Sequence, residues 1–249
     1  MVMFAGKSQN LPEVPEQAPA VYRGSAAQLP PAGGQVLARQ AGHFAAAMRF
    51  SLDQPEALQR LHKVTGGLGG LSSLGSLLPP VLAGALWLTG ADFGNIQLLD
   101  PATRSLRIVT QSGFGPEFLD YFAVVDDGHS ACGRAAQAGA QAVIADVTAD
   151  PGFAPHRDIA AASGFRAVQS TPLVDHAGRL IGMVSTHFRR PHRPAGTDLQ
   201  IMELYGDFAG EALAWYLGAP AGDGPGAPVS LWVPEVRMPC DLRRGQWQP

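Results

Sequence analysis

The chain has 249 residues, with 18 basic against 21 acidic side chains and a formal net charge of −3. This balance excludes a generally basic nucleic-acid binder. The two cysteines are too few for a disulfide framework, which favours a reducing, cytoplasmic location. No basic region followed by an apolar run opens the chain, so we expect no secretory signal. The leucine-rich stretch 68–88 has the length of a membrane span, but its glycines, serines and paired prolines favour a buried helix instead.

Both ends of the chain are rich in proline and small residues. Residues 1–34 contain five prolines and few aliphatic side chains, a composition that predicts disorder. Residues 35–70 show weak helical periodicity, with a helix expected after a cap at Asp53. Residues 218–249 are predicted to be a Pro/Gly-rich tail. One compact domain is therefore expected between them, over 71–217.

This domain opens with a predicted helix and two strands. Apolar residues at helical spacing from Leu71 to Leu88 predict the helix. Pro79 and Pro80 should break it or start a new first turn, because proline removes a backbone donor. The strands are expected over 94–99 and 106–111, joined by a turn at Asp100-Pro101.

The rest of the domain alternates short helices and strands. The predicted elements, in chain order, are a helix over 116–122, a loop at 126–130 that leads into a helix ending near 138, a strand over 143–147, a helix over 154–163, a hairpin of strands 167–173 and 180–187, and a final helix with a capping box at 197–200. This order predicts an α+β fold, with an antiparallel sheet that carries helices on its faces.

Five segments resemble the GAF domain family, of the kind found in bacterial sensor histidine kinases. In family order they are Leu88–Asp100, Ser130–Ala135, Val143–Val147, Phe165–Leu173 and Gly178–Phe188. The resemblance implies a GAF-like sheet of five or six antiparallel strands, with a pocket between one sheet face and the middle helices.

The resemblance also implies a function. It points to a non-catalytic sensory or regulatory module in signal transduction, which binds a small molecule or reports redox state. The terminal helices would pass the signal on, in a homodimer or to a separate signalling protein. The residues after the final helix are too few for a kinase unit, and the chain has no Walker-type phosphate loop, so we expect no such catalysis.

Cys132 is the first candidate site residue. It lies where a helix begins, and a helix N-terminus together with the nearby Arg134 can lower the pKa of a thiol. One interpretation is a redox-responsive or ligand-contacting thiol; the other is a small buried apolar side chain. The alternative function is a thiol enzyme resembling free methionine-R-sulfoxide reductase, in which a second cysteine resolves the intermediate as a disulfide. Here that partner could only be Cys240, which lies beyond the fold.

A set of polar residues completes the predicted ligand site. If Gln169 faces the helices, it needs a hydrogen-bond partner there, either a ligand or the loop around Asp150. No histidine pair has metal-ligand spacing, and no Cys-His dipeptide is present for a bilin, so the cofactor stays unknown. A haem would need an axial ligand such as His129, His156 or His187. The predicted ligand-binding residues are Cys132, His129, Asp146, His156, Arg166, Gln169 and Ser170.

Overall fold

The computed structural model describes residues 53–66, 68, 71 and 73–218. The predicted disordered segment 1–34, residues 35–52 of the predicted lead-in and the predicted tail from residue 219 onward lie outside the described residues.

Five antiparallel strands form a single sheet in the order β2-β1-β5-β4-β3. The strands are β1 (Phe93–Leu99), β2 (Leu106–Ser112), β3 (Ala142–Ile144), β4 (Ala167–Val174) and β5 (Leu180–Phe188). Hairpins join β1 to β2 and β4 to β5, and the pairing of β1 with β5 joins the two hairpins. The predicted α+β fold with a five-stranded antiparallel sheet is confirmed.

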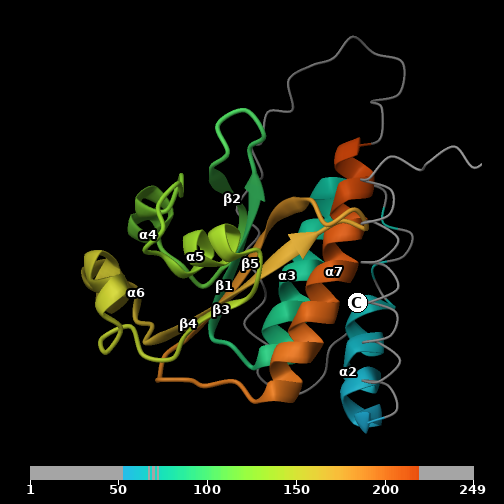
Figure 1. Ribbon diagram of the computed structural model, residues 1–249, viewed down its shortest axis with the longest axis horizontal. Coiled ribbons are helices and arrows are strands. Elements are labelled where there is room, and N and C mark those ends of the chain that lie inside the picture. Colours follow the sequence, from blue (N-terminus) through green and yellow to red (C-terminus); the bar gives the residue numbers. More distant parts are fainter. Residues whose placement is uncertain (1–52, 67, 69–70, 72, 219–249) are drawn as a thin grey trace, which may run out of the picture.

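Helices cover both faces of this sheet (Figure 1). On one face lie α2 (Pro55–Thr65), α3 (Leu74–Thr89) and α7 (Gly196–Gly218); on the other lie α4 (Pro116–Tyr121), α5 (Ala131–Ala138), the 3-10 helix η1 (Pro151–His156) and α6 (Arg157–Ser163). The sheet therefore separates two hydrophobic clusters. The first contains leucines and Tyr205 from α3 and α7, and the second is rich in phenylalanine.

The helix α3 continues through Pro79 and Pro80, so the predicted break is wrong. Ser73 caps the helix: its side chain accepts a hydrogen bond from the Ser76 amide at 3.2 Å, and the Ser76 side chain accepts one from the Ser73 amide at 3.1 Å. The prolines remove two backbone donors, but Leu78 and its apolar neighbours are fully buried. Each such side chain contributes about 2 kcal/mol by burial, which offsets the lost hydrogen bonds.

Several other predicted boundaries differ from the structure. The helix α2 begins at Pro55 with Gln54 as its N-cap, so Asp53 is not the cap. The helix α7 begins at Gly196, which places Thr197 inside the first turn rather than at the cap. The strand β3 ends at Ile144 instead of residue 147, and the predicted helix 154–163 divides into η1 and α6. No helix in the described part of the chain is long and apolar enough to cross a membrane.

Candidate functional site

The sheet face under α4 and α5 carries a row of polar side chains. On β1, Asn95 and Gln97 point to this face because successive residues of a strand alternate between faces, and Ile96 joins the opposite core. The strand register pairs Asn95 with Ser185, and Ser185 with Ser170. The two serine hydroxyl oxygens are 2.7 Å apart. These side chains form a polar floor that crosses three strands.

Short helices form the roof above this floor. The helix α5 is capped by Ser130, whose hydroxyl accepts a hydrogen bond from the Gly133 amide at 3.2 Å. Arg134 donates to both carboxylate oxygens of Asp150, at 2.9 and 2.8 Å. Asp150 in turn caps η1 by accepting from the Phe153 amide at 3.0 Å. The roof is therefore held together by hydrogen bonds between α5 and η1.

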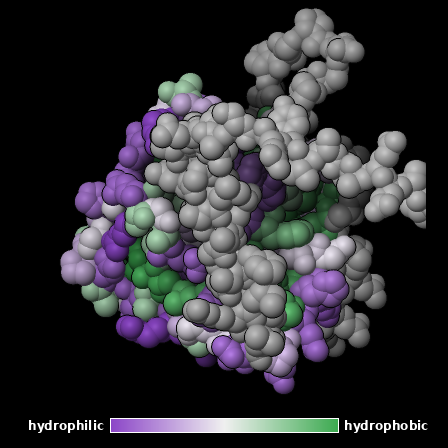
Figure 2. Space-filling view, turned by 45° about the vertical axis from the view of Figure 1, so that its right-hand side comes forward, coloured by the Kyte–Doolittle hydropathy of each residue, from purple (hydrophilic) through white to green (hydrophobic). Residues whose placement is uncertain are grey.

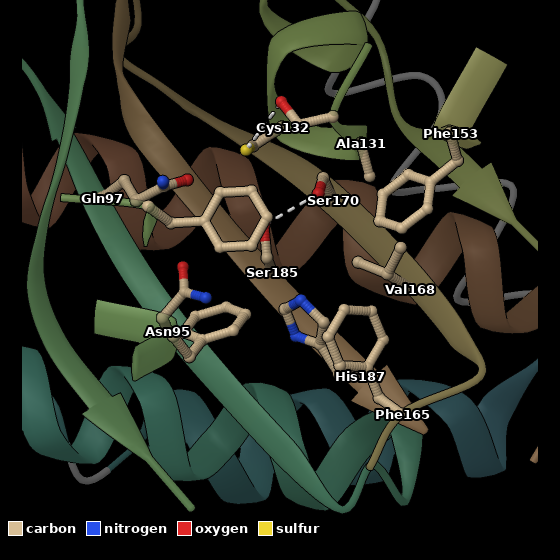
Figure 3. Close-up of a pocket in the computed structure, with 13 residues that line it drawn as sticks. Asn95, Gln97, Ala131, Cys132, Phe153, Phe165, Val168, Ser170, Ser185 and His187 are labelled. Atoms are coloured by element: carbon tan, nitrogen blue, oxygen red, sulfur yellow. Dashed lines mark hydrogen bonds between the residues drawn. The ribbon is translucent and has the colours of Figure 1, made fainter. Parts of the chain in front are cut away.

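Floor and roof enclose a small cavity (Figure 3). Its free volume is about 20 Å³, room for about one water molecule. Side chains of the strands converge on it from the sheet, and Cys132 and Phe153 face them from the roof. Its lining consists of small or neutral polar groups and aromatic rings: Asn95, Gln97, Phe118, Phe122, Ser130, Ala131, Cys132, Phe153, Phe165, Val168, Ser170, Ser185 and His187.

Three of these side chains have a buried polar atom with no hydrogen-bond partner in the structure. The atoms are Asn95 Oδ1, Gln97 Oε1 and His187 Nδ1. The three residues are 3%, 1% and 5% exposed, so bulk water does not reach them. A buried polar atom without a partner costs about 1–3 kcal/mol. The cavity thus holds hydrogen-bonding capacity that a bound molecule would satisfy.

His187 is the titratable group at the centre of the site. Burial lowers its pKa to about 3, so the imidazole is neutral at physiological pH. The rings of Phe114, Phe118 and Phe165 surround it edge-on, with centroid distances of 4.9, 5.7 and 4.7 Å. A neutral imidazole can donate from one ring nitrogen and accept at the other.

Cys132 contacts the cavity but lacks the activation expected of a reactive thiol. Burial raises the pKa of Cys132, and this effect outweighs the hydrogen bond to Ser130. Arg134 does not compensate, because its guanidinium is engaged with Asp150. The prediction that the helix N-terminus and Arg134 lower this pKa is therefore wrong.

Of the seven predicted site residues, the structure brings only Cys132 and Ser170 to the cavity. His129 is exposed in the loop before α5. Arg166 and Asp146 pair with one another on the outer surface, with Nη2 2.7 Å from Oδ2. These three residues lie outside the cavity lining.

His156 and Gln169 are buried but lie elsewhere. The His156 ring nitrogen Nδ1 is 3.0 Å from the Tyr121 hydroxyl, behind the roof. Gln169 points to the opposite sheet face from Ser170, where its Nε2 donates to Gln141 Oε1 at 2.8 Å. The predicted bond to the loop around Asp150 is therefore wrong. Gln169 borders a separate open groove of about 280 Å³ between α2, α3 and the start of α7.

Sequence reasoning missed most of the polar floor. Asn95, Gln97 and Ser185 were not among the predicted residues, and His187 was considered only as a haem ligand. A signal was present in β1, where Asn95 and Gln97 alternate with apolar residues and so mark one face of the strand; in β5 Thr186 lies between Ser185 and His187 and hides the same alternation.

The site does not fit the cofactors that the sequence left open. Among the described residues, no group of three or more His, Cys, Asp or Glu could hold a metal ion. Of the three candidate haem ligands only His187 lines the cavity, and its ring is packed edge-on among Phe114, Phe118 and Phe165. The lining also holds no cationic side chain that could pair with the propionates of haem.

Comparisons with known proteins agree with this fold. A GAF domain family model matches residues 72–214, more than half of the chain. The structure is similar to the GAF domain of a phosphoenolpyruvate-protein phosphotransferase from Coxiella burnetii, with a TM-score of 0.56 and 17% identity over 66% of this chain and 97% of that chain. The corresponding domain from Acinetobacter gives a TM-score of 0.54 and 13% identity over 67% and 97%.

An enzyme shares the same fold. Free methionine-R-sulfoxide reductase from Neisseria meningitidis, solved with its substrate, gives a TM-score of 0.55 and 19% identity over 66% of this chain and 92% of that chain. No curated protein matches the chain. Likenesses at these identities concern the fold alone, but the match to the family model covers the whole sheet and the helices from α3 through most of α7. The chain therefore belongs to the GAF domain family.

Proposed function

We propose that this GAF domain is a non-catalytic sensory module that binds a small molecule in the cavity between the sheet and α5. The observation that carries the proposal is that three of the side chains lining one cavity each have a buried polar atom without a hydrogen-bond partner. Small-molecule sites combine an apolar hollow with a few convergent polar groups, and this cavity has both. Because its free volume is about 20 Å³, a ligand larger than water must displace part of the roof.

The proposed output runs through β4 to α7. One face of β4 supplies Ser170 to the cavity floor, and the other face packs against α7. At Gly206 and Gly210 the helix lies so close to β4 that a Cβ would meet strand backbone. A ligand can shift the equilibrium between two arrangements of β4 and α7 only by the difference between its affinities for the two.

Release of a bound molecule from the full-length chain tests the proposal. The gently purified protein is denatured, and the released compounds are identified by mass spectrometry. We expect Ser185→Val, which fills the cavity floor, to abolish the release. Thr186→Val changes a neighbour on the opposite sheet face, equally buried at 0% against 2%, and should retain it. Equal release from both variants, or none from the wild type, contradicts the proposal.

A thiol enzyme is the second candidate, favoured by the contact of Cys132 with the cavity. In that reaction the thiolate attacks the sulfoxide sulfur, releases the thioether and becomes a sulfenic acid. A second thiol then condenses with it to a disulfide and water, and a thiol reductant restores both. The raised pKa of Cys132 opposes this chemistry. Sulfoxide-dependent oxidation of a thiol reductant that is lost in Cys132→Ala would establish it.

A homodimer through the terminal helices remains a prediction. The helix α7 exposes Phe208, Trp215 and Leu217, at 44%, 74% and 44%. In the view turned toward this side of the molecule, hydrophobic residues reach the surface between hydrophilic ones (Figure 2). Light scattering at tens of micromolar should give twice the chain mass, and a monomer would exclude the dimer; a separate signalling protein would then be the partner.

A further inference from the structure

The cavity combines hydrogen-bond acceptors with a complete absence of charge in its lining. The unpartnered atoms of Asn95 and Gln97 are amide oxygens, which can only accept hydrogen bonds. None of the lining residues is Asp, Glu, Lys or Arg, and the one imidazole is neutral. An anion placed here would lose its hydration and gain no counter-charge, at a prohibitive cost in free energy. The lining therefore favours an uncharged molecule that brings hydrogen-bond donors to these two oxygens.

The phenylalanines that line the cavity favour a ligand of a particular shape. Four phenylalanines line the cavity, Phe118 and Phe122 from the α4 region, Phe153 from η1 and Phe165 before β4. Aromatic rings pack best against other flat rings, edge-on or in offset stacks. The polar floor comes from β1, β4 and β5, whereas Phe118, Phe122 and Phe153 come from the α4 region and η1, so polar and aromatic contacts reach a bound molecule from different elements.

We propose that the ligand is an uncharged planar ring compound with at least two N–H or O–H donors on the side that faces β1. This inference rests on the small-molecule binding proposed above and specifies the chemical class of the ligand. Donors from the ring meet Asn95 Oδ1 and Gln97 Oε1, and His187 Nδ1 takes a third contact as donor or acceptor. Neutral lactam rings and aromatic amides have this chemistry, whereas phosphate and carboxylate ligands do not.

The roof is the part of the site able to accommodate such a ring. A ring is larger than the single water molecule for which the cavity has room, so α4 or α5 must move outward. These helices have 6 and 8 residues. Helices this short are stabilised by their tertiary contacts rather than by their own hydrogen bonds, and they are therefore the elements that can shift.

Matched pairs of probes test the charge requirement on the full-length chain. Uracil is compared with orotate, and benzamide with benzoate, by calorimetry; within each pair the ring is the same and the second member carries a carboxylate. We expect a neutral member to bind at least about tenfold more tightly than its charged partner. Tighter binding of the charged members overturns the ligand class while leaving small-molecule binding intact.

The failure of every probe also has a defined meaning. If no probe binds at millimolar concentration but denaturation still releases a molecule from the wild type, the ligand class is wrong and the proposed function stands. If no molecule is released either, the proposed function fails with it. The two proposals are thus separated by one comparison.

A pair of isosteric variants tests the role of the unpartnered amide. Gln97→Met removes the acceptor in the cavity, and Gln169→Met removes an equally buried amide on the opposite sheet face. For the probe that binds, Gln97→Met should weaken affinity about tenfold, the value of one neutral hydrogen bond. Gln169→Met should leave the affinity unchanged. Equal affinities in Gln97→Met and the wild type overturn the assignment, and Asn95→Leu replaces Gln97→Met if that variant does not fold.

Discussion

The burial of His187 makes the domain sensitive to acid. An ordinary histidine has a pKa of 6.5, and in the folded chain the pKa of His187 is lowered to about 3 because its ring is desolvated. Between these values the unfolded chain binds a proton that the folded chain does not. The free energy of unfolding therefore falls as the pH drops from 6.5 toward 3, and this contribution is constant above 6.5.

We predict that His187→Gln, which cannot titrate, loses this part of the pH dependence. The difference in slope between wild type and variant should approach about 1.4 kcal/mol per pH unit below pH 6. Urea unfolding at a series of pH values measures it. Parallel curves for the two proteins would show that His187 becomes protonated without unfolding, and hence that its cavity admits water.

The candidate site shows which residue-scale features the sequence reveals. Cys132 and Ser170 were found because each lies in a segment whose element and start were predicted. Gln169 was assigned to the site because the alternation along β4 separates it from Val168 but does not show which sheet face carries the cavity. Asn95 and Ser185 are brought together by the pairing of β1 with β5, and no local pattern encodes this long-range register.

At the scale of elements, the contact between α7 and β4 is made by glycines. The final helix was predicted from the sequence, but Gly206 and Gly210 gave no sign of a contact, because glycine ordinarily weakens a helix. Here both are buried, and a side chain at either position would enter the space of the β4 backbone. Sequence patterns detect large apolar side chains, whereas a close approach between backbones depends on their absence.

We predict that Gly210→Ala strongly destabilises the domain. The added methyl group would overlap Val174 and Leu173, so that either α7 or β4 has to move. We expect the free energy of unfolding to fall by about 2–3 kcal/mol, the usual result of overpacking. Gly75→Ala is the control, since a Cβ there meets nothing within 4 Å and should raise helix stability by up to about 1 kcal/mol. Chemical denaturation distinguishes them, and similar effects of both would argue against the close contact.

At the scale of the molecule, the sheet separates two layers that differ in construction. One layer contains the long helices α3 and α7, of 16 and 23 residues. The other contains α4, α5, η1 and α6, each of 8 residues or fewer. The sheet and the general placement of helices followed from the predicted order of elements. The small size of the cavity did not, because side-chain packing decides it.

We predict that the two layers open with different free energies. Amide hydrogens of α4 and α5 should exchange through local opening, and those of β4, β5 and α7 only through global unfolding. Hydrogen exchange followed by mass spectrometry measures the difference in opening free energy between the two layers, in the wild type and in the Ser185→Val variant. Exchange of the α4 and α5 amides as slow as that of β4 in the wild type would mean that the roof does not open by itself.

The glycine contact also bears on how far a movement can travel. At Gly206 and Gly210 no side chain of the helix separates α7 from the β4 backbone, so rotamer changes cannot absorb a small displacement of the strand there. The helix has 23 residues and a length of about 35 Å. A tilt of α7 about Gly206 would therefore displace Trp215, whose side chain is 74% exposed near the end of the helix.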